Sequence, residues 1–359
     1  MNGLLQSQAD FISALKTLEP SNLLALDTEF MRERSYRPQL CLVQLGDAAQ
    51  QVCIDPFLID NLTPLAERLT DPGQVKLIHA AAQDLEVLHQ RLGILPAPIF
   101  DTQLAATLCG VGEQIGYAGL IERLLGVVLD KSSSRTDWSQ RPLTPEQYRY
   151  ALDDVRYLPD VYAILSEKLH ALGRSDWMRE DCEGLLDPAR WTMEPLEAWR
   201  KVKGWQLIPK SGFARLRQLA AWREREAQAQ DRPRRWVLDD ERLLHLVKRP
   251  PRSLRALQHG GILPAHLFPV AEVLLLALEN AEHDPTLPPP MWLPLQGRER
   301  ERFKHLVDAL ETCAKTLNLP ASLLLNRSEL ERLAREPSRL DTVQGWRATV
   351  CGEALASAL

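Results

Sequence analysis

Four carboxylates and one phenol occur at spacings that could build a metal-dependent hydrolytic site. Asp27 and Glu29 stand two residues apart in the apolar run LLALDTEF, residues 23–30, which suits a buried strand. Side chains two positions apart on a strand leave the same face, with Cα atoms about 6.5–7 Å apart, so these carboxylates could share a cation. For an isolated Asp-x-Glu, the alternative is a strand end with solvated acids.

The other candidates lie on expected helices. Asp84 falls in the first turn of a helix that should begin near Ala82, at the end of the sheet where active sites of α/β proteins gather, although an acid there could simply compensate the helix dipole. Tyr150 and Asp154 are four residues apart on a later helix, so they share one face about 6 Å apart along the axis. The neighbouring Asp153 points about 100° away and is expected to face solvent or to make a cap-like contact.

The elements that must position these residues alternate as in an α/β protein. The strand at 23–30 is followed by a hairpin that turns at 46–50. A helix, a strand, a helix and a short apolar segment follow at 63–69, 75–79, 82–92 and 100–109. Thr144 and Gln147 form a capping box, and Pro145 suits the first helical position. Together they predict a helix from about 145 to about 171, bent or broken at Pro159. The order βββαβαβα is that of a ribonuclease-H-like core.

Length and charge indicate more than one domain. A chain of 359 residues exceeds one ordinary core and predicts two or three domains, with boundaries near 190 and 285 and a Pro-rich linker at 288–290. Residues 1–190 hold 17 Lys and Arg against 27 Asp and Glu, a net charge of −10, whereas residues 191–270 hold 16 against 8, a net charge of +8. The acidic part could host cations. The basic part could attract phosphates, or it could merely solubilise helices.

Composition argues against several other classes of protein. Hydrophobic residues make up 45% and charged residues 25% of the chain, and no apolar run approaches the roughly 20 residues that span a bilayer. The first residues do not have the pattern of a signal peptide, so a cytoplasmic location is expected. The six cysteines are far apart with no Cys-x-x-Cys pair, which argues against a zinc site or a disulfide framework.

Taken together, the acidic motifs resemble a known group of nucleases. Asp-x-Glu at 27–29, the later Asp84 and Tyr-x-x-x-Asp at 150–154 are similar to the three exonuclease motifs of the DEDD superfamily, in its tyrosine subclass. The segments DKSSSRTDW, RPL and YALDDVRYL, which lie within residues 130–158, extend the resemblance to the bacterial ribonuclease D family. The resemblance covers most of residues 20–165. It implies an α/β ribonuclease-H-like exonuclease core, a mixed sheet flanked by helices, over residues 1–190.

The resemblance also implies a role for each acidic residue. Asp27, Glu29, Asp84 and Asp154 would bind two divalent cations, Mg²⁺ or Mn²⁺, and Tyr150 would orient the attacking water. Hard cations prefer oxygen ligands, which supports this assignment independently. An ordinary tyrosine pKa of about 10 argues against a free-standing general base at neutral pH.

The C-terminal half resembles a nucleic-acid-binding module. Residues 194–270 are similar to the helicase-and-RNase-D C-terminal (HRDC) domain, a small all-α bundle that we place at 191–280, and residues 290–359 resemble a second, more divergent copy. In the domain at 191–280, Trp199, Trp205 and Trp222 are expected to lie in the core, although tryptophans can also serve as stacking platforms for bases. Its basic side is expected to contact RNA through Arg215, Arg217 and Arg223.

Five further residues have two interpretations each. Lys131, Arg135 and Arg141 flank the Tyr-x-x-x-Asp helix and could contact the RNA backbone, or they could form surface ion pairs with Asp130 or Asp137. Asp101 could belong to the site, but the favoured role is a helix N-cap near Leu104. His79 could contact the site, but a hydrogen-bonded core histidine at a strand end is favoured.

These observations predict an enzyme. The expected reaction is 3′→5′ exonucleolytic removal of nucleotides from RNA, with precursor tRNA as the substrate that the family implies and 5′-mononucleotides as products. Two alternatives remain, a 3′→5′ DNA exonuclease with the same metal site and a non-catalytic RNA-binding adaptor. Sensitivity to the terminal 2′-hydroxyl would separate RNA from DNA as substrate.

Overall fold

The structure is a computed structural model that describes residues 4–18, 21–130, 136–259, 263–282 and 294–359. The chain divides into two compact units. Unit 1 contains residues up to 31, residues 38–191 and residues 295–359, and unit 2 contains residues 32–37 and 192–294. One cut between the units lies between residues 191 and 192, and the division into three domains with boundaries near 190 and 285 stays a prediction. None of the helices in the described parts of the chain combines the length and hydropathy needed to span a lipid bilayer.

Unit 1 is built on a mixed six-stranded sheet in the order β1-β4-β3-β2-β5-β6. The strands β2, β3 and β4 form the expected antiparallel meander, β5 and β6 continue it in parallel with β2, and β1 adds parallel to β4. Their bounds are β1 Leu4–Leu5, β2 Leu23–Met31, β3 Gln39–Gly46, β4 Gln51–Ile54, β5 Val75–Ile78 and β6 Ile99–Asp101. The predicted mixed sheet is confirmed, and β1 is the strand that the sequence pattern missed because it has only two residues.

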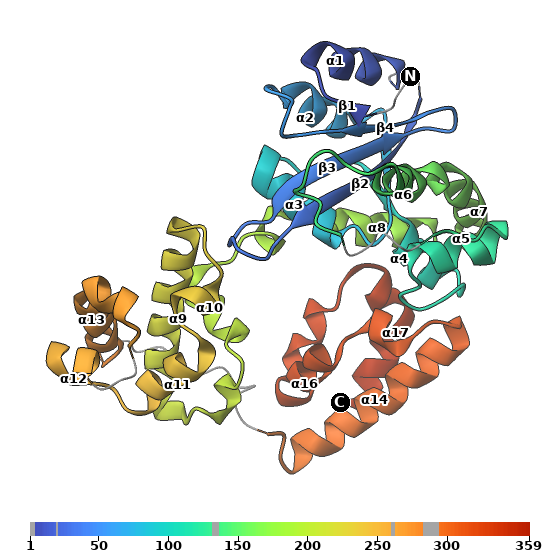
Figure 1. Ribbon diagram of the computed structural model, residues 1–359. Coiled ribbons are helices and arrows are strands. Elements are labelled where there is room, and N and C mark those ends of the chain that lie inside the picture. Colours follow the sequence, from blue (N-terminus) through green and yellow to red (C-terminus); the bar gives the residue numbers. More distant parts are fainter. Residues whose placement is uncertain (1–3, 19–20, 131–135, 260–262, 283–293) are drawn as a thin grey trace. The chain divides into compact units, whose positions relative to one another are not determined.

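The helices of unit 1 occur along the chain in nearly the predicted order. They are α1 Gln8–Thr17, α2 Thr63–Leu69, α3 Ala82–Leu92, α4 Thr102–Leu108, α5 Tyr117–Leu125, α6 Pro145–Arg156, α7 Leu158–Ala171 and α8 Ser175–Leu185. The predicted helix from 145 to 171 is broken at Tyr157, because Pro159 has no N–H for a continuous helix and is accommodated in the first turn of α7. Helix α6 packs on β2, β3 and β4, and Figure 1 shows it beside β2 and β3.

The C-terminal helices belong to unit 1. They are α14 Arg298–Leu317, α15 Ala321–Leu324, α16 Arg327–Arg335 and α17 Gly345–Ala358, with the short turn η7 Pro337–Thr342. Trp346 of α17 stacks on Trp177 of α8 with ring centroids 4.5 Å apart, and Arg347 forms an ion pair with Asp181 of α8. Residues 295–359 therefore pack against α8 within unit 1, and their identity as a divergent HRDC copy stays a prediction.

Unit 2 is all-helical around a tryptophan-rich core. Its elements include η2 Pro195–Lys201, α9 Phe213–Ala229, α10 Arg234–Val237, α11 Asp240–Lys248, α12 Leu254–His259, η5 Ala265–Val270 and α13 Ala271–Glu282. Trp199 is buried with edge-on contacts to Trp205 and Phe213, at ring-centroid distances of 5.1 and 5.3 Å. Trp222 is buried as well. The prediction that these tryptophans form the core is confirmed for Trp199 and Trp222, and Trp205 packs against the same core.

The loop between β2 and β3 contributes a tyrosine to unit 2. The Tyr36 hydroxyl donates to the carboxylate of Glu224, which is fully buried on α9, and Arg234 pairs with the same carboxylate. The Arg234 guanidinium also lies over the Tyr36 ring, 4.8 Å from its centroid. The backbone N–H of Arg37 donates to Asp231 at 2.9 Å. Nothing in the sequence pattern had predicted that residues 32–37 pack with the helical unit.

Candidate active site

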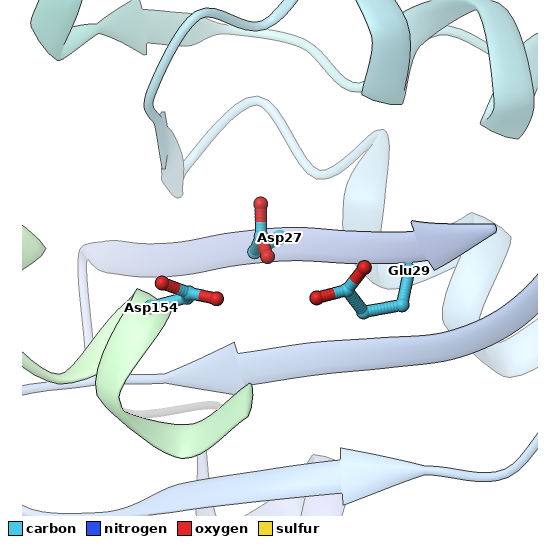
Figure 2. Close-up of side chains that lie close together, drawn as sticks. All are labelled: Asp27, Glu29 and Asp154. Atoms are coloured by element: carbon cyan, nitrogen blue, oxygen red, sulfur yellow. The ribbon is translucent and has the colours of Figure 1, made fainter. Parts of the chain in front are cut away.

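Three of the four predicted carboxylates meet between β2 and α6. Asp27, Glu29 and Asp154 each present an oxygen within 4.8 Å of the others, and Figure 2 shows the two strand residues and the helix residue converging. Asp27 and Glu29 share a strand face because side chains alternate along β2.

The predicted capping box fixes the start of α6, the helix that carries Asp154. Thr144 accepts from the Gln147 N–H at 3.2 Å, and its own N–H donates to Gln147 Oε1 at 2.9 Å.

Asp84 lies at the same cleft but outside this tight group. It is in the first turn of α3, as predicted, and is 5% exposed. Its carboxylate accepts a hydrogen bond from the Thr28 hydroxyl at 2.5 Å. Burial and then the charge of Asp27 raise the pKa of Asp84 well above its ordinary range, so the two carboxylates repel one another. The structure therefore brings all four acids to one site and holds Asp84 through Thr28, a partner that the sequence did not reveal.

The four acids and Tyr150 line a cleft of about 450 Å³ in unit 1. Its lining includes Asp27, Thr28, Glu29, Phe30, Met31, His79, Ala80, Gln83, Asp84, Tyr117, Thr136, Trp138, Tyr150 and Asp154. The ring of Trp138 lies beside that of Tyr150, with centroids 6.0 Å apart. Trp138 belongs to the segment DKSSSRTDW, so a signal for it was present in the sequence. No such signal marked Tyr117, whose hydroxyl donates to the Asp153 carbonyl at 2.8 Å.

The electrostatics of the cleft favour the binding of cations. Burial, followed by the charges of Asp27, Asp154 and Asp84, raises the pKa of Glu29 to about 10. Burial, followed by the charge of Asp153, raises the pKa of Asp154 to about 7. Among the described residues that line the cleft there is no Lys or Arg to neutralise them. An all-oxygen donor set with uncompensated repulsion fits hard divalent cations.

Tyr150 is suited to hold a group in place rather than to remove a proton. Burial and then the charge of Asp154 raise the pKa of the phenol above its ordinary value, so the hydroxyl keeps its proton at neutral pH. A hydrogen bond from this hydroxyl lowers the pKa of Asp154 and offsets part of the effect of burial. The interpretation of Tyr150 as an orienting residue fits this geometry, and its role in the reaction stays a prediction.

Comparison with known proteins agrees with this site. A family model described as a 3′–5′ exonuclease matches residues 5–170, and the HRDC domain model matches residues 212–265. Ribonuclease D of Bartonella henselae is 36% identical over 364 residues, which cover 98% of this chain and 89% of that protein. Ribonuclease D of Pseudomonas paraeruginosa is 38% identical over 348 residues, which cover 94% of this chain and 92% of that protein. The chain belongs to the ribonuclease D family.

The fold agrees with that of a ribonuclease D of known structure. The crystal structure of Escherichia coli RNase D, described as an exoribonuclease involved in structured RNA processing, matches with a TM-score of 0.89 and 33% identity over 99% of this chain and 98% of that one. The predicted enzyme class, a 3′→5′ exoribonuclease of the ribonuclease D type, is thus confirmed. Membership of this family also implies the use of divalent metal ions, for which the acidic cluster is the fitting site.

Asp101 has the structural role that we favoured, whereas His79 is half-buried and lines the ribonuclease D cleft, although it is also hydrogen-bonded within the fold. His79 Nδ1 lies 2.9 Å from the Thr102 hydroxyl and its Nε2 lies 3.1 Å from the Ile115 carbonyl oxygen, so both ring nitrogens are hydrogen-bonded. Asp101 caps α4 by accepting from the backbone N–H groups of Gln103 and Leu104, as predicted. It also accepts from Ala80 and Ala81, at 3.1 and 2.9 Å, and so fixes the turn that leads to Asp84.

The predicted RNA contacts need revision. Arg223 is 3% exposed and pairs with Asp240 at 2.7 Å, so its placement on an RNA-binding face is wrong. Arg141 donates to Asp55 through Nε at 2.6 Å and Nη2 at 3.0 Å, so it forms an ion pair, but with Asp55 instead of Asp130 or Asp137.

The remaining four RNA-contact residues are not tested by the structure. Arg215 Nε donates to the Val247 carbonyl at 2.9 Å, so this N–H group is already hydrogen-bonded within unit 2. Arg217 is partly buried on the same helix. Lys131 and Arg135 lie outside the described residues. Their contacts with RNA stay predictions.

Proposed function

We propose that this ribonuclease D family member hydrolyses the terminal phosphodiester of RNA with two divalent cations, Mg²⁺ or Mn²⁺, and releases 5′-mononucleotides. The observation that supports this proposal most directly is that carboxylate oxygens of Asp27, Glu29 and Asp154 lie within 4.8 Å of one another, with Asp84 at the same cleft. Two divalent cations held by these carboxylates would supply activation of a water and stabilisation of the leaving 3′-oxygen.

The residues of the cleft then have separate tasks. The four carboxylates supply oxygen ligands, and Thr28 holds Asp84 through its hydroxyl. Tyr150 keeps its proton and orients the attacking water in line with the scissile bond. Trp138 packs against Tyr150 and limits the movement of its ring.

The proposed substrate is a structured RNA with a single-stranded 3′ end, and in particular precursor tRNA. The likeness to Escherichia coli RNase D, whose description refers to structured RNA processing, supports this choice. So does the net charge of +8 over residues 191–270, which suits attraction to phosphates. We propose that the HRDC domain at 191–280 and the HRDC-like segment at 290–359 hold the body of the RNA while its 3′ end enters the catalytic domain at 1–190.

Exposed arginines are the side chains through which unit 2 would attract RNA. Arg225, Arg232 and Arg235 are exposed in the described part of α9, α10 and the turn between them. They replace Arg223 in the proposed basic face. Substituting all three by Gln should weaken RNA binding and reduce the slope of log K against log salt by about 2–3, since each phosphate contact contributes about 0.7–0.9. Arg223→Gln is not a suitable member of this set because it would break the buried pair with Asp240.

The test uses the full chain and a precursor tRNA labelled at its 5′ end. We expect stepwise shortening from the 3′ end in the presence of Mg²⁺ or Mn²⁺, and no shortening by Asp154→Asn although this variant still binds the RNA. A matched DNA oligonucleotide that is shortened equally well would instead support a DNA exonuclease. RNA binding with no shortening under any metal condition would support a non-catalytic adaptor.

A further inference from the structure

A glutamine on β3 lies in register with the acidic cluster. Gln44 pairs directly with Asp27 of β2 and, on its other side, with Cys53 of β4. Directly opposite residues of antiparallel strands share one face of the sheet, with Cβ atoms about 4.5–5.5 Å apart. Asp27, Gln44 and Cys53 therefore form a row on the face that carries the metal-site carboxylates, and α6 covers this part of the sheet.

The charges of the acidic cluster also act on Cys53, at the other end of this row. Burial and then the charges of Asp27, Asp154 and Glu29 raise the pKa of the Cys53 thiol above its ordinary value. Gln44 stands between Cys53 and Asp27 in the sheet, on the face that both of them share.

The Gln44 amide is buried without a partner. The residue is 0% exposed, and neither its Nε2 nor its Oε1 has a hydrogen-bond partner among the described residues. Leaving a buried polar group in this state is unfavourable, so an apolar side chain of similar shape would be more stable here. The hydroxyl of Tyr148 on α6 is a second such atom, and its pKa is raised by burial and by the charge of Cys53, which places it near the same row. Two buried polar groups of this kind can share one ordered water.

We propose that Gln44 is a positioning residue for the metal site: in the metal-loaded protein its amide N–H donates to the Asp27 carboxylate, directly or through one buried water. This inference rests on the proposed metal site. Donors behind a metal-binding carboxylate fix its orientation, and their loss typically reduces metal affinity or activity by about 10–100-fold. The register with Asp27 gives Gln44 this place, and no other residue of β3 pairs with Asp27.

The test measures Mn²⁺ binding to metal-stripped full-length protein by titration calorimetry, without reference to turnover. Gln44→Met keeps the length of the side chain and removes both polar atoms. We expect its Mn²⁺ dissociation constant to rise about 10-fold or more, while its unfolding temperature is unchanged or higher because the unpartnered amide is gone. We also expect kcat on RNA to fall with KM unchanged. Gln44→Asn, which withdraws the amide by one methylene, should weaken Mn²⁺ binding as well.

Gln74 is a matched control: it directly precedes β5 and does not line the cleft. It is 1% exposed, and its Nε2 donates to the carbonyls of Leu18 and Ser21 at 3.1 and 2.7 Å. Gln74→Met should lower the unfolding temperature and leave Mn²⁺ binding unchanged. A Gln44→Met protein that binds Mn²⁺ within twofold of wild type would overturn the inference; if that variant does not fold, the same criterion applies to Gln44→Asn. A wild-type protein that binds no Mn²⁺ would overturn the proposed metal site and this inference with it.

Discussion

Replacing Asp154 by Asn should stabilise the metal-free protein while it abolishes activity. Burial and neighbouring charge raise the Asp154 pKa from 3.8 to about 7, so the folded state binds the proton more tightly than the unfolded state does. Below the pKa of the unfolded state, Asp154 is protonated in both states, so its raised pKa does not affect the free energy of unfolding. The cost appears as the pH rises above about 4 and is complete above about 7. Asparagine has the same shape and no charge, so it avoids this cost.

The size of the gain follows from the same pKa. A rise from 3.8 to about 7 corresponds to about 4 kcal/mol at roughly 1.4 kcal/mol per pH unit. Solvent in the open cleft screens part of the repulsion, so we expect a gain of about 2 kcal/mol at pH 8. For a unit of this size, that is an increase of about 4–8 °C in the unfolding temperature.

The assay is thermal unfolding in EDTA at pH 4 and at pH 8, with Asp176→Asn as a control on an exposed site. The Asp176 side chain is 84% exposed, so its substitution should change stability by less than about 0.5 kcal/mol. The Asp154→Asn gain should be absent at pH 4 and present at pH 8, and Mn²⁺ should stabilise wild type more than the variant. A variant that is no more stable than wild type at pH 8 would refute the claim that burial and neighbouring charge destabilise the ionised Asp154 carboxylate.

Further predictions concern Tyr150, the Tyr36 contact and the capping box. Tyr150→Phe should reduce kcat on RNA by roughly 100-fold and leave Mn²⁺ binding by calorimetry intact; unchanged turnover would remove Tyr150 from the mechanism. Tyr36→Phe removes a hydrogen bond to the buried carboxylate of Glu224 and should lower the free energy of unfolding in urea by about 1–3 kcal/mol, and an unchanged midpoint would contradict that network. Thr144→Ala should cost about 1 kcal/mol through loss of the α6 cap, whereas Thr144→Ser should be nearly neutral.

Local signals in the sequence predicted the elements of the site well. The capping box at Thr144 and Gln147 set the start of α6, and Pro159 located the break between α6 and α7 within two residues. Alternation along β2 placed Asp27 and Glu29 on one face. Each of these features depends on residues only a few positions apart, where backbone geometry alone determines which side chains are neighbours.

Contacts between distant residues could not be predicted in the same way. Arg141 pairs with Asp55, 86 positions away, and Thr28 holds Asp84, 56 positions away, so no spacing rule could choose these partners over nearer ones. Arg223 looked like part of a basic face because α9 alternates Trp and Arg. Its burial follows from α11, which supplies Asp240 as its partner. Helix periodicity gives the direction of a side chain but not what covers it.

The most direct test of the account is the release of nucleotides from an RNA that carries a label in its 3′-terminal nucleotide. With Mg²⁺ or Mn²⁺, the full chain should release the label as a 5′-mononucleotide from the first turnover. EDTA, Asp27→Asn or Asp154→Asn should each abolish that release. Equal release in EDTA, or labelled products longer than one nucleotide, would contradict a metal-dependent 3′→5′ exoribonuclease built on Asp27, Glu29, Asp84 and Asp154.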